Sequence, residues 1–265
     1  QMQEYIKCTN DFYYFCAKYA KINHPVHGLI DFIPYTYQKR VIECYGTNRF
    51  NILSKFRQGG LTTVSVIWAL WRCLFKSSQR IMLVSKTDRE AIAASDMAKT
   101  TVEYLPSWLK PETDKFNEHE KQFKTTNSIF WSYTAEAARG KAITILIIDE
   151  ASRINRSLKK LIEEKAIQYQ VKVVYIGDIY QLPPVNEPIS TVFNHKHKTK
   201  LNTIVRQKDS NPNNYLIELA RNDVKNSTDT LYHHIKSIKG SINEETKEGY
   251  KILDKNAYYS ELINY

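Results

Sequence analysis

The chain contains a glycine-bearing segment of the kind that binds phosphate groups. Residues 55–63 read Lys-Phe-Arg-Gln-Gly-Gly-Leu-Thr-Thr. In such a loop the glycines let backbone N–H groups approach phosphates, a lysine contacts the β and γ oxygens, and a hydroxyl binds magnesium. Leu61 stands where the lysine is ordinarily found, and two cationic residues, Lys55 and Arg57, lie at the start of the loop. The candidate ligands are Gly59, Gly60, Thr62 and Thr63, with Thr62 as the magnesium ligand.

A pair of carboxylates, Asp149 and Glu150, directly follows four aliphatic residues at 145–148. Such a run predicts a buried strand, and open α/β sheets bind ligands at the carboxyl ends of their strands. In P-loop enzymes the aspartate holds magnesium through water, and the glutamate orients the attacking water. We expect these roles for Asp149 and Glu150. The alternative, in which the pair only caps a helix that includes Ser152, leaves the phosphate loop unexplained.

Both motifs lie within an alternation of strands and helices that is typical of a parallel sheet covered on both faces. Strands are predicted over residues 49–54, 80–85, 127–133, 144–148 and 171–176. Helices are predicted over residues 12–19, 34–45, 62–75 and 89–104. The phosphate loop thus joins a strand to the helix behind it. The predicted fold class is α/β, a three-layer P-loop NTPase core of the RecA-like type with a mainly parallel sheet and a helical N-terminal lead-in.

Residues 5–150 resemble the ATPase module of tailed-phage terminase large subunits, the DNA-packaging motors. The segments that carry the resemblance are 8–12 (Cys-Thr-Asn-Asp-Phe), 24–32 (His-Pro-Val-His-Gly-Leu-Ile-Asp-Phe), 34–38 (Pro-Tyr-Thr-Tyr-Gln), 49–53 (Arg-Phe-Asn-Ile-Leu) and 55–60. Some terminases carry a deviant loop whose lysine stands five residues before the last glycine, which is the position of Lys55. The resemblance implies that Lys55 contacts phosphate and that Arg57 is a second phosphate-binding or sensing cation. The alternative is that both are surface charges on a glycine turn.

The same resemblance implies further roles and partners. Gln38, after Tyr37, matches the glutamine that reads adenine in terminases. The implied cofactors are ATP and Mg²⁺. The implied partners are double-stranded or single-stranded DNA and portal or other phage proteins, because terminases act as rings around a portal. A homo-oligomer and the cytoplasm of a virus-infected host cell follow as the expected state and location.

From residue 147 onward the sequence resembles superfamily 1 DNA helicases of the RecD and Dda branch. The matching segments are 148–152 (Ile-Asp-Glu-Ala-Ser), 175–185 (Tyr-Ile-Gly-Asp-Ile-Tyr-Gln-Leu-Pro-Pro-Val) and 205–207 (Val-Arg-Gln). By this resemblance Gln181 senses the γ-phosphate and couples it to DNA, while Arg206 reaches the γ-phosphate. Neither the lysine-bearing first loop of a helicase nor the nuclease domain of a terminase is evident in the sequence.

The overall composition is that of a packed protein with a basic surface. Hydrophobic residues make up 42% and charged residues 25%, which excludes the composition of a disordered chain. A net charge of +10 favours a polyanion such as nucleic acid or an anionic membrane, the alternative being a solvated basic surface. No apolar run approaches the roughly 20 residues of a spanning helix and no secretion signal is seen, so we expect a soluble intracellular protein without a membrane partner. The four cysteines form no CxxC pair, and we expect reduced thiols rather than metal ligands.

Composition changes after about residue 185, where Asn and Lys become dense, and residues 222–248 are polar and weakly patterned. We expect a lead-in over residues 1–30, an ATPase core over 31–208 and a partial helicase-like extension over 209–265. The expected function is an ATP-hydrolysing DNA motor of the terminase-like packaging or translocating kind. Two alternatives are a superfamily 1 helicase that separates strands and a non-hydrolysing DNA-binding scaffold in which Leu61 marks a decayed loop.

Overall fold

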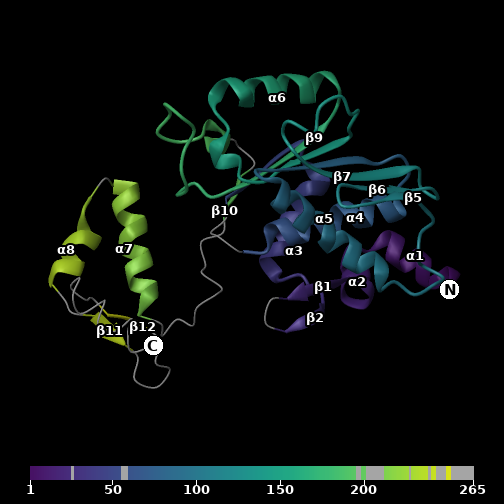
Figure 1. Ribbon diagram of the computed structural model, residues 1–265, viewed down its shortest axis with the longest axis horizontal. Helices are drawn as coiled ribbons and strands as arrows, with labels where there is room; N and C mark the ends of the chain where they lie inside the picture. Colours follow the sequence, from purple (N-terminus) through teal and green to yellow (C-terminus); the bar gives the residue numbers. More distant parts are fainter. Residues whose placement is uncertain are drawn as a thin grey trace. The chain divides into compact units, whose positions relative to one another are not determined.

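The computed structural model describes most of the chain and divides it into two units, Gln1–Asn202 and Thr203–Tyr265 (Figure 1). The described residues are 1–24, 27–54, 59–194, 198–200, 212–226, 228–237, 240–242 and 249–251. Three predicted site residues, Lys55, Arg57 and Arg206, lie outside them. Among the described residues, no helix combines the length and the apolar character that crossing a membrane requires. The three-part division predicted from composition stays a prediction.

An eight-stranded sheet forms the centre of the first unit, and its strand order is β10-β3-β9-β8-β4-β7-β6-β5. The five pairings from β10 to β7 are parallel, whereas β6 and β5 join antiparallel at one edge. The predicted α/β class with a mainly parallel sheet is therefore confirmed. The strands are β3 (Phe50–Ser54), β4 (Arg80–Ser85), β5 (Thr113–Phe116), β6 (Glu120–Phe123), β7 (Ser128–Thr134), β8 (Ile145–Ile148), β9 (Lys172–Gly177) and β10 (Lys198–Lys200).

Helices cover both faces of this sheet, as Figure 1 shows, with α6 (Arg156–Gln168) on the side opposite α3, α4 and α5. The strands alternate accordingly: Leu53 and Val174 belong to the core under α4, while Ile52 and Tyr175 belong to a smaller core under α6. Central strands that are buried on both faces need near-continuous apolar sequence, which explains why their positions were predictable. The helices on the crowded side are α1 (Met2–Asn10), α2 (Phe12–Tyr19), α3 (Thr36–Thr47), α4 (Leu61–Phe75) and α5 (Asp88–Glu103).

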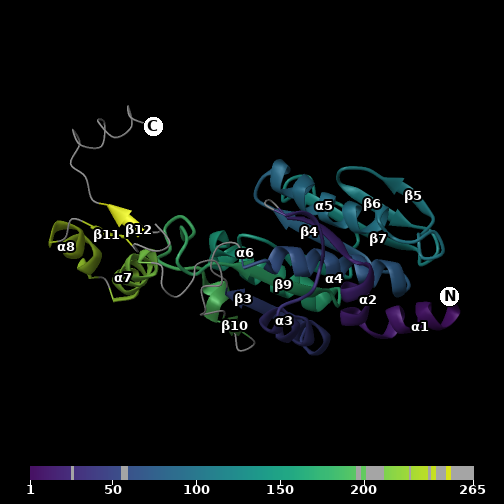
Figure 2. The same ribbon diagram turned by 90° about the horizontal axis from the view of Figure 1, so that it is seen from below.

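The N-terminal helices α1 and α2 lie beside α4 at one end of the unit (Figure 2). Trp71 of α4 donates its indole N–H to the carbonyl of Cys8 at 2.8 Å, and the Lys76 ammonium donates to the carbonyl of Thr9 at 3.0 Å. Both bonds satisfy carbonyls at the end of α1, which have no partner within the helix. A short antiparallel hairpin, β1 (Lys21–His24) with β2 (Gly28–Asp31), then leads to α3.

The second unit contains two helices and a two-stranded hairpin within its described residues: α7 (Asn213–Asn226), α8 (Thr230–Ser237), and β11 (Gly240–Ile242) paired antiparallel with β12 (Gly249–Lys251). The sequence is polar and weakly patterned over residues 222–248, and regular elements nevertheless form there. Asp223 supplies the physical reason, because its carboxylate accepts the backbone N–H groups of Thr230 and Leu231 at 2.8 and 2.7 Å. These bonds satisfy donors at the start of α8, where no partner within the helix exists.

Candidate nucleotide-binding site

The glycines of the phosphate loop lie between β3 and α4, where the sequence placed them. Gly60 has a φ of +65° and occupies the N-cap position of α4. A Cβ at this position would lie 2.7 Å from Nε2 of Gln38, which is closer than real Cβ contacts. Gly60 is thus required both by its left-handed backbone and by the close approach of α3.

Two side chains of α3 bind the loop backbone. The hydroxyl of Tyr37 donates to the carbonyl of Gly59 at 2.8 Å, and Nε2 of Gln38 donates to the carbonyl of Gly60 at 3.1 Å. The Gln38 side-chain oxygen accepts the backbone N–H of Tyr35 at 2.9 Å, and Gln38 is only 2% exposed. Both ends of the Gln38 amide therefore bond within the protein. Its adenine-reading role stays a prediction, and an adenine contact would require one of these bonds to be exchanged.

Helix α4, which follows the phosphate loop, contacts the acidic pair directly. The hydroxyl of Thr62, in the first turn of α4, donates to Oδ2 of Asp149 at 2.7 Å across 87 positions of sequence. The other carboxylate oxygen accepts the backbone N–H of Glu150 at 3.0 Å, and the backbone N–H of Asp149 donates to the carbonyl of Val84 at 2.9 Å. The Asp149 carboxylate is therefore held in a fixed orientation between β8 and α4.

Glu150 adopts a left-handed backbone conformation, with φ 57° and ψ 39°. This region costs a non-glycine residue on the order of 1–3 kcal/mol and is often found at functional sites. The chain then turns into the short 3₁₀ helix η1 (Ala151–Arg153), for which the Glu150 side chain forms no cap hydrogen bond. The simple helix-cap alternative for the acidic pair therefore has no cap bond to support it.

The turn after the acidic pair rests on the end of the neighbouring strand β9. A Cβ at Gly177 would lie 2.9 Å from the backbone nitrogen of Ser152 and 3.1 Å from that of Ala151. Since the atoms in the way are backbone atoms, the turn itself would have to shift to accept a side chain. Gly177 thus allows η1 to pack on β9, and this contact sets the position of the chain just after Glu150.

A polar cavity of about 500 Å³ lies beyond the carboxyl ends of β4, β8 and β9, which are neighbours in the sheet. Gln181 and Glu150, predicted as site residues from different parts of the sequence, both line it. The further lining residues were missed by sequence reasoning, although Lys86 directly follows a predicted strand and Arg153 follows the acidic pair. The cavity is lined by Lys86, Glu90, Glu150, Arg153, Asp178, Tyr180, Gln181 and Leu182.

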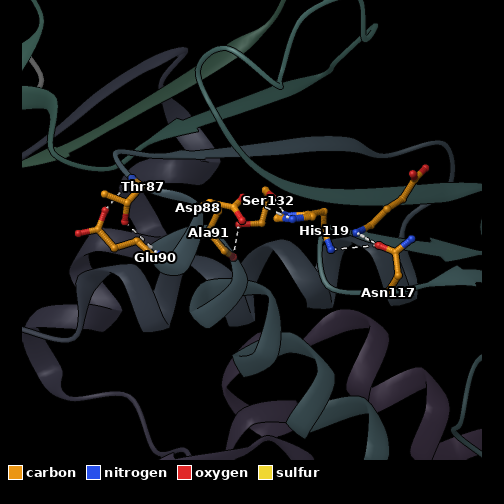
Figure 3. A network of polar contacts seen from close by, with 8 residues as sticks. Thr87, Asp88, Glu90, Ala91, Asn117, His119 and Ser132 are labelled. Atoms are coloured by element: carbon orange, nitrogen blue, oxygen red, sulfur yellow. Dashed lines mark hydrogen bonds and ion pairs between the residues drawn. The ribbon is translucent and has the colours of Figure 1, made fainter.

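A polar network holds the start of α5, which supplies Glu90 to this cavity (Figure 3). Thr87 and Glu90 form a reciprocal capping box, in which the Glu90 carboxylate accepts the backbone N–H of Thr87 at 3.0 Å. His119 contacts Asp88 through Nε2 at 3.4 Å and the carbonyl of Ser132 through Nδ1 at 2.9 Å. The Ser132 hydroxyl in turn donates to the carbonyl of Ala91 at 2.7 Å. Ser132 of β7 and His119, just before β6, thereby fix the end of α5 that faces the cavity.

Leu61, at the usual position of the phosphate lysine, is 1% exposed and packs into the core under α4. A cation that contacts the triphosphate must therefore come from another position. The predicted cations Lys55, Arg57 and Arg206 lie outside the described residues, and their roles stay predictions. Thr63 follows Thr62 in the first turn of α4 and is partly buried.

The oxygen atoms of Thr62 and Asp149 are the ligand types that Mg²⁺ prefers, which are hydroxyl, carboxylate and water. Within the described part of the chain, no group of three or more His, Cys, Asp or Glu side chains is arranged to hold a metal by itself. The Thr62 and Asp149 oxygens fit the protein's share of a Mg²⁺ shell, because this ion is usually held by one or two protein oxygens together with waters and phosphate oxygens.

Comparisons with known proteins agree with this fold. Among solved structures, the HK97 bacteriophage large terminase matches with a TM-score of 0.57 at 12% identity, covering 83% of this chain and 51% of that chain. A mutant ATPase domain of the Thermus phage P74-26 large terminase matches with a TM-score of 0.52 at 14% identity, covering 73% and 92%. Identities this low show a shared fold. The chain spans about half the length of the HK97 terminase.

A family model described as an AAA domain matches residues 62–241, which is more than half of the chain. The match begins at Thr62 and includes both Asp149 and Glu150 as well as Gln181. The chain therefore belongs to the AAA domain family, and its fold is similar to that of phage terminase ATPase domains.

Proposed function

We propose that this protein is an ATP-hydrolysing motor that acts on DNA. The observation that carries the proposal is the 2.7 Å bond between Thr62 and Asp149, which joins the phosphate loop to the strand-end carboxylate. In this assignment Thr62 and Asp149 hold magnesium with the nucleotide. When bound there, the metal would neutralise negative charge on the phosphate oxygens.

The phosphate loop binds the triphosphate in this proposal. The backbone N–H groups of Gly59 and Gly60 and the start of α4, including Thr63, face the phosphates, since a helix N-terminus favours anions. Lys55 supplies the missing lysine, with Arg57 as a second cation. The burial of Leu61 supports this assignment, because the residue at the ordinary lysine position is part of the core. Tyr37 and Gln38, which already contact the loop, face the adenine.

Glu150 positions the attacking water and accepts its proton. Its left-handed backbone and the packing of the following turn on Gly177 support a fixed orientation for this carboxylate. Gln181 lines the same cavity and, with Arg206, reports the presence of the γ-phosphate to the DNA-contacting surface.

The substitution Glu150→Gln tests the catalytic assignment. We expect ATP turnover to fall by about 10²–10⁴-fold, because the amide cannot accept a proton. ATP binding should persist, and it can be followed as a shift in thermal unfolding with ATP and magnesium. A ligand at a hundred times its dissociation constant stabilises a protein by about 2.7 kcal/mol. Unchanged hydrolysis would refute the role of Glu150, and a wild-type protein without any nucleotide-dependent shift would favour the scaffold alternative.

The DNA substrate is the next part of the proposal. The net charge of +10 and the fold shared with terminase ATPase domains support translocation on double-stranded DNA, as in packaging. Portal or other phage proteins, a homo-oligomeric ring and a location in the cytoplasm of an infected cell belong to the same proposal. Stimulation of ATP hydrolysis by duplex DNA and by procapsids is the expected result.

Strand separation is the second candidate function. One observation favours it: Gln181, from the helicase-like segment, lines the same cavity as Glu150. A strand-displacement assay on a partly duplex substrate separates the two functions. Displacement without any stimulation by procapsids would identify a helicase rather than a packaging motor.

A further inference from the structure

An apolar groove lies on the α6 side of the sheet, far from the phosphate loop in sequence. It has a volume of about 540 Å³ and is bounded by α6 and by the residues that lead into β8 and β9. We call it the α6 groove. Its main apolar lining residues are Ile143, Leu146, Leu161, Ile162, Tyr169 and Val173.

Helix α6 leaves much of its apolar surface uncovered. Leu161 is 51% and Tyr169 65% exposed, and Ala166 is the one fully buried residue of the helix. Leu161 and Lys165 are spaced four residues apart and therefore lie along one side of α6, and Tyr169 is the residue that caps the end of this helix. A helix that packs on a sheet normally buries its apolar stripe, and exposed apolar surface beside a cavity marks interaction sites.

The charges of the groove are of one sign. Lys141 and Lys165 are its charged lining residues, and within the described residues neither forms an ion pair with a carboxylate. The Lys141 ammonium lies 5.1 Å from the ring centroids of Trp131 and Tyr133. The Lys165 ammonium lies over the ring of Tyr169 and donates to a glutamine side chain.

Other lysines of the same helix behave differently. Lys159 pairs with Glu163 at 3.7 Å, and Lys160 pairs with Glu164 at 3.8 Å. Within α6, therefore, Lys159 and Lys160 have a carboxylate partner, whereas the groove lysine Lys165 has none among the described residues. A ligand that brings carboxylates beside an apolar surface would complement both the shape and the charge of this groove.

We propose that the α6 groove binds an acidic amphipathic helix of a partner protein. A strand is disfavoured because β8 and β9 already have neighbours on both sides, so the groove offers no free sheet edge for strand addition. A nucleic acid is disfavoured by the apolar lining. A second copy of the chain is disfavoured by its own charge of +10. An amphipathic helix reads such a groove through apolar anchors spaced at i, i+3, i+4 and i+7.

The test uses a fluorescein-labelled helical peptide of about 16 residues, roughly four turns. It carries leucine at the anchor spacing and glutamate on the flanking positions, and a second peptide has lysine in place of every glutamate. Fluorescence anisotropy with the whole protein should show that the glutamate peptide binds at least about tenfold more tightly. The substitution Leu161→Glu should weaken it by about tenfold or more.

Matched variants separate the groove from general effects. Leu158→Glu changes an exposed leucine of α6 that does not line the groove, and it should leave binding unchanged. The double variant Lys141→Glu with Lys165→Glu should reverse the preference in favour of the lysine peptide. Lys110→Glu with Lys124→Glu changes the net charge equally at exposed positions elsewhere and should not.

Thermal unfolding controls for folding, and if Leu161→Glu lowers the unfolding temperature more than Leu158→Glu does, the double lysine variant decides. Equal binding of both peptides by all variants would overturn the proposal. Sedimentation supplies the remaining outcome. A concentration-dependent dimer that Leu161→Glu abolishes would overturn the partner helix in favour of a second copy.

Discussion

The two faces of the central sheet are covered to very different degrees. Helix α4, on the crowded face, buries 12 of its 15 residues, whereas α6, on the opposite face, buries 1 of its 13. A helix that is apolar on all sides belongs to a core, while a sparsely buried helix depends on other contacts. The residue that bonds to the acidic pair, Thr62, lies on the crowded helix. The molecule therefore places its proposed chemistry on the tightly packed element and its proposed docking surface on the loosely packed one.

Replacing one leucine by alanine on each face of the sheet tests this difference in burial. Leu70 of α4 is fully buried, so Leu70→Ala should lower the free energy of unfolding by about 2–5 kcal/mol. Leu161→Ala, at a half-exposed position of α6, should cost less than about 0.5 kcal/mol. Urea unfolding followed by tryptophan fluorescence gives both values. Similar losses at the two positions would contradict the contrast between the faces.

The contact of Gly177 with the turn after the acidic pair is the next target. Gly177→Ala would place a methyl group 2.9 Å from the Ser152 nitrogen, and the turn would have to move. A displacement of this kind near a reacting group can cost about a hundredfold in rate. We expect kcat for ATP to fall by that order while the nucleotide-dependent thermal shift persists.

The control for this prediction is Gly46→Ala, because a Cβ at Gly46 would meet no atom within 4 Å. This variant should keep full turnover. If Gly177→Ala also kept full turnover, the turn would not position Glu150.

Two buried tyrosine hydroxyls sharpen the comparison further. Tyr45, on the crowded face, shares a hydrogen bond of 2.7 Å with Ser65 of α4. Tyr45→Phe leaves Ser65 without this partner and should cost about 1 kcal/mol. Tyr175 belongs to the core under α6, and its hydroxyl is buried without a hydrogen-bond partner among the described residues. Tyr175→Phe should therefore be neutral or stabilising in the same unfolding experiment, and a loss as large as that of Tyr45→Phe would be the contrary result.

A buried lysine gives the smallest expected effect, and it depends on pH. Burial lowers the pKa of Lys121 to about 8, and its ammonium contacts Ser95 of α5. The pKa of an unfolded lysine is about 10.4, so between these values the unfolded chain binds more protons and rising pH favours the fold. Relative to Lys121→Met, the wild type should gain less than about 1 kcal/mol between pH 7 and pH 9, after allowance for solvent screening.

The quantity to measure is the difference in stability between the wild type and Lys121→Met. Burial also raises the pKa of Cys8 to about 11, and a buried thiol with a raised pKa makes stability fall as pH rises. That contribution is common to both proteins and cancels. A pH-independent difference for Lys121→Met would show that the buried amine does not titrate in this range.

Much of the fold could be predicted because the central strands carry their own signal. The aliphatic runs at β8 and β9 predict buried strands, and α2 and β4 have the bounds that their sequence predicts. The edge strand β5 and its neighbour β6 gave no such signal, because charged residues such as Asp114 and Glu120 interrupt them. Short edge strands depend on pairing with their neighbour, which local sequence does not reveal.

The site was predictable where a motif stands at the end of a strand, and not where it depends on sheet order. Thr62 and Asp149 could be selected from the phosphate loop and the aliphatic run, although their roles stay predictions. Lys86 and Glu90 reach the cavity only because β4 lies next to β8, which no local pattern specifies. Likewise, the spacing of Leu158, Leu161 and Ile162 is helical. Yet the groove beside α6 is also lined by Ile143 and Leu146, which are distant from the helix in sequence.

The hydrogen bonds of Gln38 have a consequence for how the protein distinguishes its ligands. One side chain spans the start of α3 and the carbonyl of Gly60. If an adenine base formed hydrogen bonds with the Gln38 amide, the bond from Gln38 to the Gly60 carbonyl would break. Binding of the base and binding of the phosphates by the loop would then be thermodynamically coupled through this one side chain. Inorganic triphosphate carries no base and would leave the hydrogen bond between Gln38 and Gly60 intact. The affinity for ATP relative to inorganic triphosphate would then include the free-energy cost of breaking this hydrogen bond.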